Sequence, residues 1–222
     1  MANDLTNEMY ALKLGDARLV KRALSIVADI QDNPGRSFPK MLGSPRKAEA
    51  FYRFINSSAV TPSALLKPHH AQSWRRAADK SSCTLILHDT SFVSMPGEVT
   101  RRGLPRDGEK QGFYMHTALA VAEVEAPVVH GVVGVDVYTI WDRMWYRETD
   151  VNREELCIGS QRWGMLVKDV AAAAPPSQRL IHVMDREADD YALWTEILET
   201  GGDFVIRVQH DRRLAGAVER LS

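Results

Sequence analysis

TLILHD, residues 84–89, and RLIHVMD, residues 179–185, are two short apolar runs of β-strand character, and each ends in an aspartate. In an open α/β sheet, ligands gather beyond the carboxyl ends of the strands, so Asp89 and Asp185 would lie where sites form. Two carboxylates at such an edge suit hard divalent cations such as Mg²⁺. An aspartate after a strand also serves as a turn former or helix cap, so both interpretations stay open for each acid.

The sequence around these two runs predicts a mixed sheet. Two β-rich runs, at 112–124 and 128–140, are joined by residues 125–127 and predict a hairpin. Helical and strand patterns then alternate in this order: a helix at 154–174, a strand at 179–184, a helix at 189–200 and a strand at 204–209. A hairpin followed by βαβ units implies an α/β fold class, with helices on the faces of a mixed sheet.

The first third of the sequence is predicted to be helical. Asp16 is a suitable N-cap for the apolar residues that follow it at helical spacing. Ser44-Pro45 and Thr61-Pro62 each combine a cap with a proline at the first helical position. The segment 33–45, rich in Pro, Gly and Ser, is predicted as a loop, and Pro68 is expected to break or kink the helical region around it.

Charge is distributed unevenly along the 222 residues, although the formal net charge is only −1. Residues 1–80 contain 13 Lys and Arg against seven Asp and Glu, a net +6, whereas residues 81–222 carry a net −7. The change of charge coincides with the change of pattern. We therefore predict a helical domain at 1–80, basic enough to bind DNA, and an α/β domain at 81–222.

Composition excludes several classes of protein. Hydrophobic residues make up 45% of the chain, which excludes disorder over its whole length. No apolar run approaches the roughly 18 residues of a membrane helix, and the first residues do not resemble a signal peptide. The two cysteines are isolated in the sequence, which suits a reducing cytoplasm. No phosphate-binding loop, dinucleotide-binding glycine motif or serine-hydrolase elbow occurs.

The run at 185–190, DREADD, places five charges in six residues. One interpretation is a solvated helix start, where acidic side chains complement the helix dipole. The other is a metal-binding Asp185 followed by Arg186, whose guanidinium would reach a phosphate. The run by itself does not distinguish them.

Six segments give the sequence a resemblance to a known family. They are LGDAR (14–18), EAFYRF (49–54), HDTS (88–91), YMHT (114–117), DREAD (185–189) and FVIR (204–207). In this order, over nearly the whole chain, they resemble the DDE cut-and-paste transposases of the Tn-five type, in the insertion-sequence-four family. DREAD after an apolar strand is the most specific of the six.

The resemblance implies a ribonuclease-H-like catalytic domain, in which two Asp and one Glu bind Mg²⁺ or Mn²⁺ and cleave and join DNA. Asp89 would be the first of these carboxylates and Asp185 the second, and Arg186 and Arg207 would contact the DNA backbone. The basic helices of 1–80 would bind double-stranded DNA at the transposon ends. The cations expected to do so are Arg18, Lys21, Arg22, Arg46, Lys47 and Arg53. Family members act as dimers on DNA, associated with the bacterial nucleoid.

One family motif has no counterpart in the sequence. The third carboxylate is expected in a Tyr-x-x-Arg-x-x-x-Glu helix, and this spacing does not occur, nor does the family's dimerisation region. We therefore expect the chain to be truncated at its C-terminus.

 The chain would be the front portion of such an enzyme, without efficient cleavage of its own. Three functions stay open: DNA binding with two metal-ligating carboxylates, DNA binding alone as a remnant, and a small nuclease that recruits Glu187 or Glu196 as a further acid.

Overall fold

The computed structural model describes residues 5–95, 106–107, 110–122, 127–138, 159–209, 212–213 and 220–221. Its contacts divide the chain into two compact units, Met1–Gln72 and Ser73–Ser222. The division falls inside helix α5 (Pro62–Ala78), whereas the sequence predicts a boundary just after that helix, at residue 80. Among the described residues, no helix is both long enough and apolar enough to cross a lipid bilayer.

Four helices precede α5 in the first unit: α1 (Leu5–Met9), α2 (Ala17–Asp32), α3 (Phe38–Met41) and α4 (Pro45–Ile55). Asp16, Ser44 and Thr61 each accept a hydrogen bond from a backbone N–H two or three residues later. These bonds satisfy N–H groups that have no partner within the first turn of a helix. The three predicted helix starts are therefore confirmed.

Two expectations for this unit were wrong. The segment 33–45 is not entirely a loop, because the short helix α3 forms within it. Phe38 of α3 packs on Phe51 of α4, with ring centroids 4.4 Å apart, and this contact does not follow from the local sequence. Of the two effects expected of Pro68, a break does not occur, because α5 runs through it without interruption. The proline is buried, so its packing offsets the backbone hydrogen bond that it removes.

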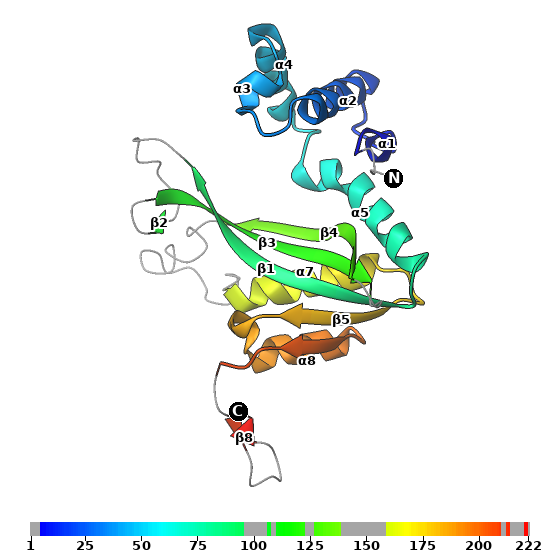
Figure 1. The fold of residues 1–222 in the computed structure, drawn as a ribbon, viewed down its shortest axis with the longest axis vertical. Helices are drawn as coiled ribbons and strands as arrows, with labels where there is room; N and C mark the ends of the chain where they lie inside the picture. Colours follow the sequence, from blue (N-terminus) through cyan, green and yellow to red (C-terminus); the bar gives the residue numbers. More distant parts are fainter. Residues whose placement is uncertain are drawn as a thin grey trace. The chain divides into compact units, whose positions relative to one another are not determined.

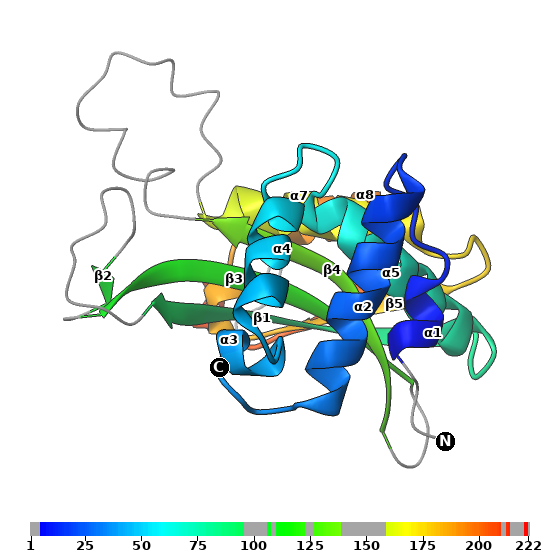
Figure 2. The ribbon, with the colours of Figure 1, turned by 90° about the horizontal axis from the view of Figure 1, so that it is seen from above.

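Apolar residues from these helices form one core. The buried members are Met9, Leu12, Leu14, Ala23, Ile26, Leu42 and Phe54. Figure 2, which looks down on this unit, shows α2 and α4 next to each other, in agreement with the contacts between them. Because both helices bury their apolar sides in the same core, their basic sides are exposed together.

The second unit is built on a mixed sheet (Figure 1). Its strands lie in the order β4 (Val128–Tyr138), β3 (Lys110–Ala122), β1 (Cys83–Met95), β5 (Arg179–Met184) and β6 (Asp203–Ile206). The short β2 (Arg106–Asp107) also pairs with β3, and β7 (Arg212–Arg213) pairs separately with β8 (Arg220–Leu221). β3 is antiparallel to both β1 and β4, whereas β1, β5 and β6 are mutually parallel. The predicted hairpin and the mixed α/β class are confirmed.

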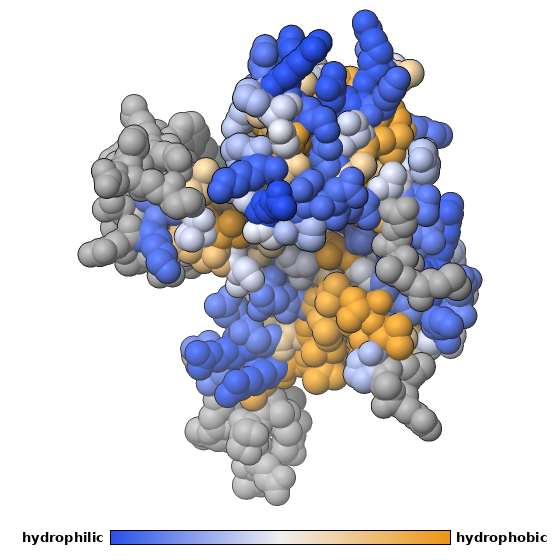
Figure 3. Space-filling model, turned by 45° about the horizontal axis from the view of Figure 1, so that its top comes forward, coloured by the Kyte–Doolittle hydropathy of each residue, from blue (hydrophilic) through white to orange (hydrophobic). Residues whose placement is uncertain are grey.

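Helices cover one face of this sheet. Helices α7 (Gly159–Ala173) and α8 (Tyr191–Glu199) pack on alternate, buried residues of the strands, such as Ile86 and Met184. In the described part of the chain, the other face carries aliphatic side chains that are only partly buried: Leu85, Leu87, Ile181 and Val183. Figure 3 shows a hydrophobic area on the surface of this unit. The predicted flanking helices are therefore present, and within the described residues α7 and α8 cover one face of the sheet.

Three histidines interrupt the apolar core on the covered face. His116 of β3, His88 of β1 and His182 of β5 are all buried, and we call them the imidazole row. His88 Nδ1 lies 3.1 Å from His116 Nε2, and His88 Nε2 lies 2.9 Å from His182 Nδ1. At one end of the row, Thr90 Oγ1 lies 2.7 Å from His116 Nδ1.

Burial keeps the imidazole row uncharged. It lowers the pKa of His116 and of His182 from the ordinary 6.5 to about 4, although Asp136 and Asp89 act in the opposite direction on His116. Burial also holds the pKa of His88 well below its ordinary value, and its two neighbouring imidazoles add to this effect. All three rings are therefore neutral near pH 7, and each has one N–H donor and one acceptor nitrogen.

The row predicts that the second unit loses stability in mild acid. Unfolded imidazoles take up protons below about pH 6.5, whereas His116 and His182 in the folded chain resist protonation until about pH 4. The free energy of unfolding should therefore fall as the pH is lowered through this window, by on the order of 3 kcal/mol for each of the two groups. Urea unfolding from pH 7.5 down to about pH 4, the lower end of this window, measures the slope. A free energy of unfolding that stays constant over this range would contradict the prediction.

Candidate functional site

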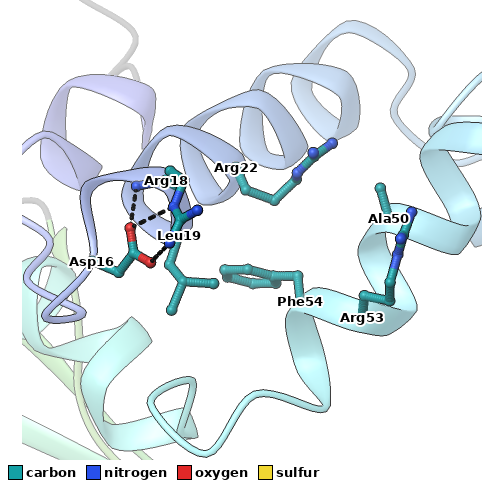
Figure 4. A pocket seen from close by; sticks show the side chains of 7 residues that line it. All are labelled: Asp16, Arg18, Leu19, Arg22, Ala50, Arg53 and Phe54. Carbon is teal, nitrogen blue, oxygen red and sulfur yellow. Dashed lines mark hydrogen bonds and ion pairs between the residues drawn. The ribbon is translucent and has the colours of Figure 1, made fainter.

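A cleft of about 360 Å³ lies between α2 and α4 in the helical unit (Figure 4). It is lined by Asp16, Arg18, Leu19, Arg22, Ala50, Arg53 and Phe54. Leu19 and Phe54 point toward each other between the two helices and form an apolar floor. Arg18 and Arg22 lie four residues apart on α2, so they share one side of that helix. The cleft thus brings together three of the six cations that the sequence predicts for DNA binding by the helical domain.

Asp16 has two roles at this cleft. Its Oδ1 accepts a hydrogen bond from the backbone N–H of Arg18 at 2.7 Å, which caps α2, and its Oδ2 lies 3.1 Å from Arg18 Nη2. The hydrogen bonds from the side chain and backbone of Arg18 lower the pKa of Asp16, and Asp16 raises the pKa of Arg18. The Arg18 side chain is 92% exposed, so water screens this ion pair and the guanidinium remains accessible to a ligand.

The other predicted cations differ in how far they are already paired. Lys47 Nζ lies 2.6 Å from Asp29 Oδ1, an ion pair that joins α4 to α2. Arg53 lies 3.6 Å from Glu49, one helical turn earlier, and both side chains are largely exposed. No ion pair or hydrogen bond to a described residue engages the side chains of three others: Lys21, Arg22 and Arg46. Arg22 is therefore the cleft arginine whose charge is least compensated.

Two cations near these helices were not predicted as site residues. Arg36 and Lys40 line a second cleft, of about 590 Å³, together with residues at the start of α4. Both belong to the segment 33–45, which has no periodicity to indicate which side chains share a surface. Their presence extends the positive charge of this unit beyond the residues that the sequence pattern identified.

Asp89 and Asp185 lie just beyond the point where the pairing of β1 with β5 ends. The prediction that the first of these strands ends at Asp89 was wrong, because β1 continues to Met95 through its pairing with β3. β1 and β5 are parallel and pair up to Leu87 with Val183, and the same register continued by two residues sets Asp89 opposite Asp185. Both side chains are exposed. Asp89 Oδ2 accepts a hydrogen bond from Ser91 Oγ at 2.9 Å, and Asp185 Oδ1 accepts one from the backbone N–H of Glu187 at 2.9 Å.

Arg207 lies close to Asp185. β5 and β6 pair up to Met184 with Ile206, and the backbone N–H of Arg207 donates to the Met184 carbonyl at 3.2 Å. Arg207, the first residue after β6, therefore lies beside the end of β5, which Asp185 directly follows. Arg186 is exposed at the start of the short 3₁₀ helix η3 (Arg186–Ala188), which Asp185 caps. DREADD thus begins a helix, as the first interpretation of this run has it, and also holds Asp185 and Arg186 at the end of β5.

A further carboxylate does not join the pair among the described residues, which contain no group of three or more potential metal ligands. Glu196 of α8 instead forms an ion pair with Lys168 of α7, at 3.0 Å. Glu187 is exposed on η3. Asp89 and Asp185 are therefore a pair of carboxylates, with hydroxyl and backbone groups as their hydrogen-bond partners.

One comparison with known proteins bears on the first of these two sites. Residues 1–60 match the family model described as "Transposase DNA-binding". The matched range contains α1 to α4 and every residue that lines the cleft between α2 and α4. The front of the chain is therefore similar to the DNA-binding domain of transposases.

Proposed function

We propose that the chain binds double-stranded DNA by seating the sugar–phosphate backbone at the cleft between α2 and α4. The observation that supports this most strongly is the cluster of Arg18, Arg22 and Arg53 around one cleft, inside the range that matches the transposase DNA-binding model. Guanidinium groups form charge-assisted, often bidentate hydrogen bonds with phosphate oxygens. Contacts of this kind supply affinity and position the protein on the duplex.

The electrostatics of the cleft favour an anion despite Asp16. This carboxylate is already hydrogen-bonded to the backbone and side chain of Arg18, so its charge is largely compensated within the protein. Arg22 comes from α2 and Arg53 from α4, so a phosphate between the helices would meet a cation on each side. The apolar floor of Leu19 and Phe54 offers no competing acceptor.

Substitution of the two arginines tests the cleft. Arg22→Gln and Arg53→Gln should each weaken binding to a 25-base-pair duplex of arbitrary sequence several-fold, because each removes a phosphate contact. Each should also reduce the slope of log K against log salt concentration by about 0.9. Fluorescence anisotropy over a range of KCl concentrations measures both quantities.

Lys67→Gln provides the matched control, because Lys67 is an exposed cation on α5 that does not line the cleft. It removes the same charge and should leave the affinity and the salt slope close to those of the unmodified chain. Equal effects of Lys67→Gln and Arg22→Gln would mean that DNA responds to net charge alone, and the cleft proposal would be wrong.

We further propose that Asp89 and Asp185 are two ligands of a Mg²⁺ or Mn²⁺ site in a transposase-like catalytic domain. Asp89 Oδ1 and Asp185 Oδ2 make no hydrogen bond to a described residue, so each carboxylate keeps one oxygen for a cation. This donor set fits the preference of Mg²⁺ for carboxylate oxygens. When bound, such cations would activate water and stabilise the leaving oxygen in phosphodiester cleavage. Arg186 and Arg207 would hold the neighbouring phosphate.

The carboxylate pair predicts a measurable affinity for Mn²⁺. Asp89→Asn and Asp185→Asn should each weaken Mn²⁺ binding by more than about tenfold, because each removes a charged ligand while its shape is kept. Electron paramagnetic resonance of free Mn²⁺ gives the dissociation constant. Asp79→Asn, an exposed acid at the end of α5, is the control and should leave the constant unchanged. Unaltered binding in both ligand variants would refute the metal proposal and favour a DNA-binding remnant.

The described residues bring two carboxylates together, one fewer than the chemistry implied by the resemblance requires, so we expect binding without efficient cleavage. Incubation of the chain with supercoiled plasmid and Mg²⁺ should leave the plasmid intact. Nicking that disappears in Asp185→Asn would instead support the small-nuclease alternative, with Glu187 on η3 as the nearest candidate in sequence for the additional acid.

A further inference from the structure

We propose that the imidazole row, His116, His88 and His182, positions Asp89 relative to Asp185 by joining β1 to β5 where the backbone pairing of these two strands ends. His88 directly precedes Asp89 on β1, and His182 precedes Asp185 by three residues on β5. The 2.9 Å contact between His88 Nε2 and His182 Nδ1 therefore connects the two carboxylate-bearing strands through side chains. This inference rests on the metal site proposed above.

The contacts require the row to act as one unit. A neutral imidazole has one donor and one acceptor, so the proton on any ring fixes the proton on the next. If Thr90 Oγ1 donates to His116 Nδ1, then His116 Nε2 donates to His88, and His88 Nε2 donates to His182 Nδ1. The opposite arrangement reverses every donor. In either case the three strands are linked by a directional chain of hydrogen bonds.

Close packing fixes the ends of the row. The ring of Trp163 from α7 lies on His116, with centroids 4.3 Å apart. At the other end, a Cβ on Gly202 would come within 3.3 Å of His182 Cδ2, so the backbone there lies directly against the ring. His182 Nε2 is buried and has no hydrogen-bond partner among the described residues, so the contact with His88 is the polar interaction of that side chain within this part of the chain. A shift of β1 along β5 would break it.

Backbone pairing between β1 and β5 does not extend to the carboxylates, although Asp89 is paired with Thr117 of β3. The paired residues of β1 and β5 end at Leu87 and Val183, before Asp89 and Asp185. The contact between His88 and His182 connects the side chains of the two strands just before the two acids. His88 and His182 are therefore positioning residues, which act on a cation only through the carboxylates.

The test is the Mn²⁺ affinity of folded variants of the full chain. His88→Leu removes both hydrogen bonds at nearly constant volume and should weaken Mn²⁺ binding by about tenfold. His88→Gln retains one donor and one acceptor, and should restore most of the affinity. His130→Leu removes another buried histidine, on β4 and outside the row, so it should lower stability without changing the Mn²⁺ affinity.

A second measurement uses the unmodified chain and does not depend on whether the variants fold. Titration with Mg²⁺ should shift the ring ¹⁵N resonances of His88 and His182 but not that of His130, and Asp89→Asn should abolish the shift. The positioning role would be overturned by a folded His88→Leu chain that binds Mn²⁺ like the unmodified chain. It would also be overturned if the ¹⁵N resonances of His88 and His182 did not shift on addition of Mg²⁺. If Asp89→Asn and Asp185→Asn also leave Mn²⁺ binding unchanged, the metal site itself fails, and the two failures are thereby distinguished.

Discussion

The parallel pairing of β1 with β5 is the interaction on which the arrangement of the second unit depends. It joins segments almost a hundred residues apart in sequence and sets their register from Cys83 with Arg179 to Leu87 with Val183. That register sets Asp89 opposite Asp185 on the exposed side and brings His88 to His182 on the buried side. Because side chains alternate along a strand, a slip by one residue would exchange these two sets of groups.

The sequence predicted the elements whose causes are local. The caps at Asp16, Ser44 and Thr61 depend on a side chain and a backbone N–H at most three residues away, so the sequence pattern was sufficient. Helix α3 and the unbroken α5 were missed because they depend on tertiary packing, of Phe38 on Phe51 and of the buried Pro68. Local patterns carry no information about such contacts.

For the candidate sites too, the sequence identified individual residues but not their arrangement in space. Asp89 and Asp185 could be identified because each ends an apolar run, but their opposition requires the strand order and register. The imidazole row was not foreseen, since three histidines that lie 28 and 66 residues apart show no periodic pattern. In the helical unit, the sequence marked the cations but not their partners, and Lys47 proves to join α4 to α2 through Asp29.

Asp16 illustrates how one carboxylate ties folding to recognition. Its oxygens cap α2 and also hold the guanidinium of Arg18 beside the cleft. An asparagine at this position would keep the cap but release the arginine and add a positive charge to the surface. A hydrophobic residue would remove the cap of α2 and release the arginine at once. A substitution at Asp16 therefore changes the stability of α2 and the surface potential beside the cleft together. Its effect depends on the residue at position 18, so positions 16 and 18 are coupled through the structure.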